Sequence, residues 1–473
     1  MKLIDNDLLS MQEARILAEN SKEAQRLLST FSQEKLDGII EGLASELLKN
    51  LDKISEELQE EVDFGNQEDK KKKIKFILEK VVEKIKPMKC VGVIGENKEE
   101  KIVDIGVPMG VIVVLSSESN PISTMIYNLL IGLKTGNTMI FNLQNNSKNT
   151  MIKTLDFIID RMEELGAPRG TVSYLSRISK NGIKELINHE NIDLILNTGV
   201  EELLEEIKLS GKPMVYGRTG NTPAFIEESA DIKKSVTDII RSKTFDNGVM
   251  SGSEQAIVVS RAIVEKVTGE FQKQGGYFLS EDESYRLKEI LFDKQGKFKR
   301  NYIGRSAKFI GNVAGIEVPS ETKLLISREK YISLDNPFSK EKLCPLVSFY
   351  VEDNWREACE KCIELLLNER QGHTLVIHSK DEEIIREFAL KKPVGRILVN
   401  TSGAQGSMGE STNLFPSMTL GCGVIGKGMT SDNVSPQNLI YIRKVAYEKN
   451  IVEEKKDSEF LNKLEKILRE ILK

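Results

Sequence analysis

Short apolar, β-branched runs alternate with helical stretches from residue 110 onward, and this alternation constrains the fold more than any other feature of the chain. The runs occupy residues 111–115, 138–141, 171–175, 192–196 and 214–216. Between them, apolar residues recur at helical spacing over 123–134, 148–165, 180–189 and 201–209. Strand and helix in repeated succession predict a parallel sheet with helices on both faces. The sequence therefore predicts an α/β fold.

The chain as a whole divides into four parts. A first domain over 1–228 starts with helical patterns, carries a two-stranded ribbon within 88–108, and ends with a strand near 225–227. A second αβ domain is expected over 229–425, followed by a bridging segment over 426–447. The last part, 448–473, is a charged linker that leads into an amphipathic helix. A length of 473 residues is enough for two or three hydrophobic cores.

Charge and composition exclude several classes of protein. The 67 basic and 72 acidic side chains give a net charge of −5, which argues against a nucleic-acid binder. No apolar run approaches the ~20 residues that a membrane span needs. The five cysteines are an odd, sparse set that suits a reducing compartment, so a cytoplasmic protein is expected. Cys359 and Cys362 are predicted to pack a helix rather than hold zinc, and no metal site is expected.

Lysines at 70–73 and 75 form a basic run that only Ile74 interrupts. The run lies within a helical pattern near the start of the chain. Such a run favours a solvated helix face, so its side chains are expected in water.

The most informative segment is the loop SKTFDNGVMSGSEQ at 242–255, just before an apolar run at 256–259. Taken alone, it is a glycine-containing connection of an ordinary kind. Further blocks accompany it in order: GNTPAFIE at 220–227, EKLCP at 341–345, GHT at 372–374, IREFALKKP at 385–393 and TLGCG at 419–423. Together these blocks resemble the aldehyde dehydrogenase superfamily, in the CoA-acylating branch that includes the ethanolamine-utilisation acetaldehyde dehydrogenases. The resemblance extends from residue 1 to about 447.

This resemblance implies the aldehyde dehydrogenase fold, with a Rossmann-like NAD-type domain, an αβ catalytic domain, and oligomerisation strands near 88–108 and 437–446. It implies that a nucleophile attacks an aldehyde, that hydride passes to NAD, and that CoA takes the acyl group. The asparagine that binds the oxyanion in the family falls on Asn120, and the glutamate that holds the nicotinamide ribose falls on Glu341. The other residues assigned to cofactor binding by resemblance are Thr198, Gly199, Phe141 and Gly220.

The nucleophilic cysteine of the family falls on Ser251. A thiol has a pKa of about 8.5 and supplies thiolate near neutral pH, whereas a hydroxyl needs an adjacent general base. No base neighbours Ser251 in the sequence. His373, from the GHT block, is a candidate for the same cleft, with a loop histidine as the alternative. Gly217 falls where hydrolytic relatives have a glutamate base, which fits acyl transfer to CoA rather than to water.

The cofactor blocks also differ from the family pattern. A turn that usually reads serine-proline-histidine-proline reads Asn-Leu-Gln-Asn at 142–145. The next turn, usually threonine-glycine-glycine, reads Thr-Gly-Val at 198–200, with glutamates at 201, 202, 205 and 206. Glutamates at a helix N-terminus compete with a pyrophosphate there. NAD binding is therefore expected to be weakened or lost. Ser407 and Lys427 are further departures, since the family has glycines at these positions.

Three functions follow from these observations. The first is an NAD-dependent, CoA-acylating short-chain aldehyde dehydrogenase that is inactive or strongly impaired because of Ser251. The second is a catalytically silent scaffold or oligomer partner of an active paralogue, and the third is an acyl hydrolase that depends on Ser251. The tail at 458–473 is either a cargo tag for a bacterial microcompartment shell or a helix that docks on the protein's own homo-oligomer.

Overall fold

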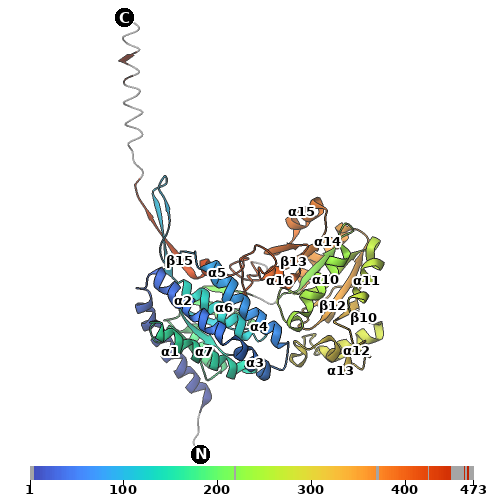
Figure 1. The fold of residues 1–473 in the computed structure, drawn as a ribbon, viewed down its shortest axis with the longest axis horizontal. Helices are drawn as coiled ribbons and strands as arrows, with labels where there is room; N and C mark the ends of the chain where they lie inside the picture. The colour runs from blue at the N-terminus through green and yellow to red at the C-terminus, as the bar shows by residue number, and fades with distance from the viewer. Residues whose placement is uncertain are drawn as a thin grey trace, which may run out of the picture.

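The computed structural model describes residues 5–217, 220–368, 372–423 and 426–448, together with 463, 466 and 467. The strands of these residues form three sheets, of five, seven and three strands. Figure 1 shows two lobes, one made by the blue-to-teal first half of the chain and the other by the green-to-orange second half. The predicted α/β fold is confirmed.

The sheet of the first lobe has the order β5-β4-β3-β6-β7, and all of its strands are parallel. Their bounds are β3 Val111–Leu115, β4 Thr138–Asn142, β5 Val172–Leu175, β6 Leu194–Asn197 and β7 Met214–Tyr216. Successive side chains of β3 enter two different hydrophobic clusters, because neighbouring residues of a strand point to opposite faces. The sheet is therefore buried on both faces, as the sequence predicted.

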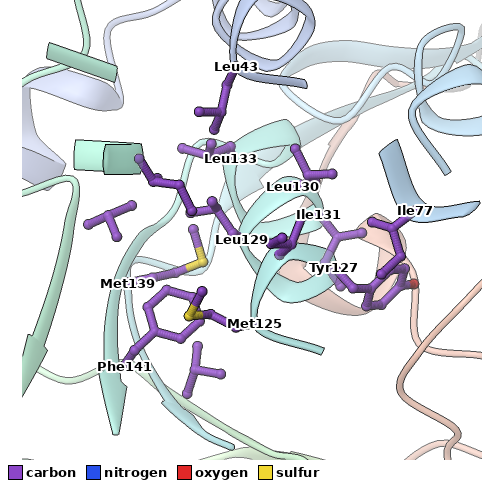
Figure 2. Close-up of a cluster of buried hydrophobic side chains, with 14 of the residues drawn as sticks. Leu43, Ile77, Met125, Tyr127, Leu129, Leu130, Ile131, Leu133, Met139 and Phe141 are labelled. Carbon is purple, nitrogen blue, oxygen red and sulfur yellow. The ribbon is translucent and has the colours of Figure 1, made fainter. Parts of the chain in front are cut away.

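Helices supply the other side of each cluster. One face packs on α2 (Gln33–Lys49), α6 (Pro121–Lys134) and α7 (Lys148–Glu164). The opposite face packs on α1 (Asn6–Leu28), α8 (Lys180–Asn188) and α9 (Leu204–Leu209). Figure 2 shows the first of these cores, where Met125 and Leu129 of α6 lie beside Met139 and Phe141 of β4. This core fixes the start of α6, which directly follows Asn120.

The helical prediction for the N-terminal region is confirmed, but the prediction for its basic run is wrong in part. The region continues with α3 (Leu51–Glu61), α4 (Gln67–Phe76), a π-helical turn (Ile77–Val81) and α5 (Val82–Ile85). Lys70 and Lys73 of α4 are only 3% and 2% exposed. Residues three apart share one face of a helix, and this face turns inward toward Asp246.

The sheet of the second lobe is also parallel, in the order β10-β11-β12-β9-β8-β13-β14. Its strands are β8 Thr222–Ile226, β9 Glu254–Ser260, β10 Gly276–Phe278, β11 Leu324–Arg328, β12 Leu346–Glu352, β13 Thr374–His378 and β14 Arg396–Val399. Its helices are α10 Ile232–Thr244, α11 Val264–Lys273, α12 Glu281–Leu291, α13 Ala307–Val313, α14 Trp355–Asn368, α15 Glu382–Lys391 and α16 Gly403–Ser407.

Strand β8 corrects one prediction. The strand expected near 225–227 was assigned to the first domain, whereas β8 pairs with β9 and β13 of the second lobe. An apolar run shows that a strand is buried but not which sheet it joins. The domain limit at 228 remains a prediction, and the topology favours a limit before β8.

The third sheet combines two distant segments of the chain. The predicted ribbon is formed by β1 (Gly92–Asn97) and β2 (Ile102–Pro108), and β15 (Ile440–Ala446) adds to β2 in antiparallel register. This sheet projects from the first lobe (Figure 1). Its role in oligomerisation stays a prediction.

The C-terminal helix predicted over 458–473 lies outside the described residues, apart from 463, 466 and 467. Within the part of the chain that the structure describes, no helix has the length and apolar character of a membrane span.

Candidate active site

Ser251 lies in the loop between α10 and β9, directly after a strained turn. A 3₁₀ turn follows α10 at Phe245–Gly248, and within it Asp246 and Asn247 have φ values of 47° and 53°. Non-glycine residues in this left-handed region persist only where contacts hold them. The loop then reaches Ser251, which is half-buried, before β9 begins at Glu254. The turn at Phe245–Gly248 therefore fixes the position of the Ser251 hydroxyl.

Contacts from the N-terminal helices hold this turn. The carboxylate of Asp246 accepts the Asn66 main-chain N–H at 2.8 Å, and Lys73 Nζ lies 2.5 Å from its other oxygen. Lys70 Nζ donates to Asp246 from 3.3 Å. Burial alone would raise the pKa of Asp246, but Lys73 and Lys70 outweigh it and hold that pKa below its usual value. The carboxylate therefore stays charged, and its two lysine partners, more than 170 residues away, were not predicted from the sequence.

Asn120 faces Ser251 across a small cavity. It precedes α6, where Pro121 takes the first helical position and the Asn120 carbonyl accepts the Thr124 N–H. Asn120 and Ser251 both line a cavity of about 30 Å³, room for about two water molecules. The Asn120 side-chain N–H₂ donates weakly to Val249 O at 3.3 Å. The predicted oxyanion donor and the predicted nucleophile position are thus brought together.

His373 is fully buried at the start of β13 and lies beside the same loop. Its Nδ1 is 2.6 Å from Thr374 Oγ1. A methyl group on Gly220 would lie 2.3 Å from His373 Nε2 and 2.7 Å from the Ser251 carbonyl oxygen, so both atoms border one point. The prediction that His373 shares the cleft with Ser251 agrees with this placement. A glycine is needed at position 220, because even a methyl group there would overlap His373 Nε2 and the Ser251 carbonyl oxygen.

A buried carboxyl, Glu254, was missed by the reasoning from sequence. It lies three residues after Ser251, and burial raises its pKa to about 7. Its Oε1 accepts the Gly403 N–H at 2.7 Å, while its Oε2 has no hydrogen-bond partner among the described residues. The neighbouring Lys243 is also buried, which lowers its pKa to about 8. Glu254 takes up a proton near neutral pH. It directly follows residues 245–253, the segment that carries Ser251 and is called the nucleophile loop.

A larger cleft of about 420 Å³ separates the two lobes next to this site. Glu341 and Gly199, both predicted to bind cofactor, line it from opposite lobes. Glu341 Oε1 accepts the Gly220 N–H at 3.1 Å. Thr198 lines the small cavity instead and links two strand ends, because its hydroxyl donates to Leu115 O at 2.9 Å. Glu341 and Gly199 therefore line the cleft, Thr198 lines the Ser251 cavity, and Gly220 is hydrogen-bonded to Glu341.

Phe141 does not join them. Its side chain is fully buried in the hydrophobic cluster of Figure 2 and lines neither the cleft nor the cavity. On β4, Met139 and Phe141 point toward α6, whereas Ile140 points to the opposite face. Strand alternation turns the Phe141 side chain into the core, so it does not reach the cleft, and the assignment of Phe141 to cofactor binding stays a prediction.

The end of the cleft where a pyrophosphate would lie does not fit that group. Main-chain N–H groups of Gly199 and Val200 could hold a phosphate, but both donate to Asn197 Oδ1, at 3.1 and 2.8 Å. Glu201 and Glu202 follow directly and line the cleft. The start of a helix binds an anion well only where its N–H groups are available and no acidic side chain competes for them.

Ion pairs cross the cleft at the same end. Arg300 lies 3.1 Å from Glu118, and Lys297 lies 3.9 Å from Glu202, each pair joining the two lobes. All four side chains are at least one-third exposed, so each pair contributes little stability. Arg300 and Lys297 of the second lobe are thus paired with acids of the first.

Two α/β lobes with a nucleophile loop and a facing amide between them define a two-lobed enzyme fold with its site in the cleft. The sequence model of the Aldehyde dehydrogenase family matches residues 6–276, and the chain belongs to this family. An aldehyde-alcohol dehydrogenase of Clostridium acetobutylicum is 35% identical over 430 residues, covering 90% of this chain and 50% of that protein. The chain thus spans about half the length of that relative. A succinate-semialdehyde dehydrogenase (acetylating) of Clostridium kluyveri is 30% identical over 432 residues, covering 91% of this chain and 95% of that one.

Solved structures agree. A probable aldehyde dehydrogenase from Listeria monocytogenes is 40% identical with a TM-score of 0.92, covering 95% of this chain and 100% of that one. An acetylating aldehyde dehydrogenase from Geobacillus thermoglucosidasius is 37% identical with a TM-score of 0.91, covering 95% and 99%. At 22% identity, a propionaldehyde dehydrogenase from a Clostridium phytofermentans fucose utilisation microcompartment shows the fold alone, with a TM-score of 0.80 and coverage of 92% and 97%. The predicted resemblance to acylating aldehyde dehydrogenases is confirmed.

Proposed function

We propose that this chain has the site of a CoA-acylating short-chain aldehyde dehydrogenase and that its turnover is strongly impaired because Ser251 replaces the thiol nucleophile. The observation that carries the proposal is the placement of Ser251 opposite Asn120 in one small cavity. A nucleophile that attacks an aldehyde carbon there would develop negative charge on the aldehyde oxygen, and an amide N–H₂ can stabilise it. The acetylating relatives support the reaction type.

The hydroxyl of Ser251 is the weak point of this site. A thiol would be partly ionised near neutral pH, whereas a serine needs a base that removes its proton. Among the described side chains, His373 is best placed for this, because its Nε2 and the Ser251 carbonyl oxygen border the same point beside Gly220. Its Nδ1 faces Thr374 Oγ1 rather than a carboxylate, and a hydroxyl does not stabilise an imidazolium as a carboxylate does. Activation of Ser251 should therefore be poor.

Transfer to CoA rather than to water is supported by Gly217. A methyl group at Gly217 would lie 2.5 Å from Thr419 Cγ2, with main-chain atoms of Leu420 at 3.2 and 3.3 Å. A glutamate cannot occupy that position without moving the segment that contains Thr419. The chain is therefore built without the carboxylate that would activate water, so CoA is the expected acyl acceptor.

Cofactor binding is proposed to be weak. NAD would accept hydride from the adduct on the nucleophile if it were bound with its ribose at Glu341. The occupied N–H groups at Gly199 and Val200, and the acids at Glu201 and Glu202, support poor binding of the pyrophosphate.

Two other functions remain candidates. A silent scaffold, or an oligomer partner of an active paralogue, is supported by the projecting sheet of β1, β2 and β15, whose edge strands are available for pairing. The microcompartment origin of one fold neighbour is compatible with such a role, with 458–473 as the contact to a shell. An acyl hydrolase that depends on Ser251 is the third candidate, and it would require His373 to act as the base.

One paired assay tests these functions. NADH formation from acetaldehyde and CoA is measured for the unaltered chain and for Ser251→Cys. We expect no measurable rate from the former and, with NAD in large excess to offset its weak binding, turnover from the latter. If both are silent and neither binds NAD by calorimetry, the scaffold function is favoured. Thioester hydrolysis that Ser251→Ala abolishes would favour the hydrolase.

A further inference from the structure

The side-chain amide of Asn120 lies between two sets of groups. On one side it borders the cavity that contains Ser251. On the other it borders a second, very small cavity of about 10 Å³, which Lys70, Lys73 and Asp246 line. Asn120 Oδ1 lies 2.5 Å from Lys73 Nζ on that second side. The amide therefore separates a buried charged cluster from the reacting centre.

Lys73 decides which way this amide points. An ammonium group only donates hydrogen bonds, so the amide atom that faces it must be the oxygen. The N–H₂ group is then forced toward the nucleophile loop, where it donates to Val249 O at 3.3 Å. Without Lys73, the oxygen and the nitrogen would be nearly interchangeable, because an amide has almost the same shape after a half-turn. An oxygen turned toward Ser251 would repel a developing oxyanion.

Asp246 fixes Lys73 in turn. Lys73 is 2% exposed and Asp246 is fully buried, with 2.5 Å between Nζ and Oδ2. A buried ammonium that met only the Asn120 carbonyl oxygen would be costly, and the carboxylate compensates it. Asp246 belongs to the strained turn that precedes Ser251. One ion pair therefore ties α4, the start of α6 and the nucleophile loop together.

Lys70 provides a natural comparison. It is also buried and also donates to Asp246, at 3.3 Å. Its other acceptors among the described residues are Gln59 Oε1 and Phe64 O, and Asn120 is not one of them. Two lysines thus share one carboxylate, and only Lys73 contacts the amide.

We propose that Lys73 is a positioning residue that orients the Asn120 amide with its N–H₂ toward the reacting carbonyl, while Asp246 of the nucleophile loop holds Lys73 in place. This inference rests on the proposed function of Asn120 as oxyanion donor. It adds a residue that touches neither substrate nor nucleophile and acts only through Asn120.

The test compares two reactions of a thiol introduced by Ser251→Cys. Acylation by p-nitrophenyl acetate passes through a tetrahedral oxyanion: the thiolate attacks the carbonyl, a thioester forms and p-nitrophenolate leaves. Alkylation by iodoacetamide displaces iodide from a saturated carbon and forms no oxyanion. The ratio of the two rates therefore isolates oxyanion stabilisation from the accessibility and ionisation of the thiol. Neither reaction needs NAD or CoA.

Lys73→Met and Asn120→Ala are each made in the Ser251→Cys chain, with Lys70→Met as the matched control. Removal of one oxyanion donor costs about 10²–10³ in rate, so Asn120→Ala should lower acylation about 100-fold. Lys73→Met should lower acylation at least tenfold and change alkylation less than twofold. Lys70→Met should leave the ratio of the two rates unchanged. If Lys73→Met does not fold, Lys73→Met/Asp246→Asn removes both charges and should show the same selective loss.

A double variant tests whether Lys73 acts through Asn120. Lys73→Met should have no further effect on the rate ratio in the Asn120→Ala background, because the group that it orients is then absent. Equal losses in acylation and alkylation, or independent losses from Lys73→Met and Asn120→Ala, would overturn the proposal. Failure of the Ser251→Cys chain to form acyl-CoA would instead count against the proposed function, since the ester assay does not depend on it.

Discussion

Gly252, the residue after Ser251, should not accept a side chain as long as Ser407 faces it. A methyl group at Gly252 would lie 1.9 Å from Ser407 Oγ and 2.8 Å from its Cβ, with Gly403 O at 3.0 Å. Rotation of the Ser407 hydroxyl away from its bond to Ala404 O would remove only the first contact. The main chain of the nucleophile loop or of α16 would have to shift.

The cost of Gly252→Ala follows from this geometry. Overpacking of this kind destabilises a folded protein by about 1–3 kcal/mol. Ser407→Gly removes both side-chain atoms that obstruct the methyl group, so the same Gly252→Ala change should then cost less than about 1 kcal/mol. The expected coupling free energy between the two positions is the difference between these costs, about 1–2 kcal/mol.

Urea unfolding of the four proteins of this cycle measures the coupling. The chain has a single tryptophan, Trp355, and it lies on α14 of the same lobe, so its fluorescence reports the unfolding of the relevant sheet and helices. A coupling free energy near zero would refute the reasoning, because it would mean that Gly252 and Ser407 are not in contact. Ser407 would then be an independent change rather than one that fits Gly252.

Three further predictions concern charges and the tail. Burial raises the pKa of Glu254 from 4.5 to about 7. Between these pH values the folded protein keeps a proton that the unfolded chain releases. The contribution of this group to stability is therefore present below pH 4.5 and lost by pH 7. It amounts to about 3 kcal/mol, and Glu254→Gln should flatten this part of the dependence of unfolding free energy on pH. Unchanged slopes would contradict the assignment. The Glu201→Gln/Glu202→Gln chain should bind NAD about thirtyfold more tightly by calorimetry at low salt, because each of the two charges removed is worth ~1 kcal/mol, and unchanged affinity would contradict repulsion of the pyrophosphate by these acids. Deletion of 449–473 should abolish co-purification with shell proteins without altering the size of the oligomer, and unchanged co-purification would end the cargo hypothesis.

Periodicity was sufficient to predict the first sheet. Residues 111–115 are all apolar, and so are 138–141 except for Thr138, and such runs between helical patterns are typical of parallel strands buried on both faces. It was not sufficient to place β8, because its partners β9 and β13 are supplied by later segments. Sheet membership depends on pairing over long sequence distances, which the pattern of a single strand does not contain.

Sequence motifs named several residues that lie at the site. Residues whose position depends on tertiary contacts, such as Lys73, were missed. Asn120 shares a cavity with Ser251, and Gly220 and His373 lie beside the Ser251 main chain, while the roles assigned to these residues stay predictions. Lys73 looked like one of several solvent-exposed lysines, and only the fold shows that Asp246 and Asn120 surround it. The spacing of Lys70 and Lys73, three residues apart on α4, was the only available signal for a shared buried face.

Acetyl transfer from acetyl-CoA to the protein tests the central claim most directly, because it examines residue 251 without NAD. In this transfer, the nucleophile attacks the thioester carbonyl and free CoA leaves. Intact mass measured over several minutes should show no acetyl group on the unaltered chain and one on the Ser251→Cys chain. Acetylation of Ser251 in the unaltered chain, as fast as that of the thiol variant, would contradict the claim that the hydroxyl limits this site.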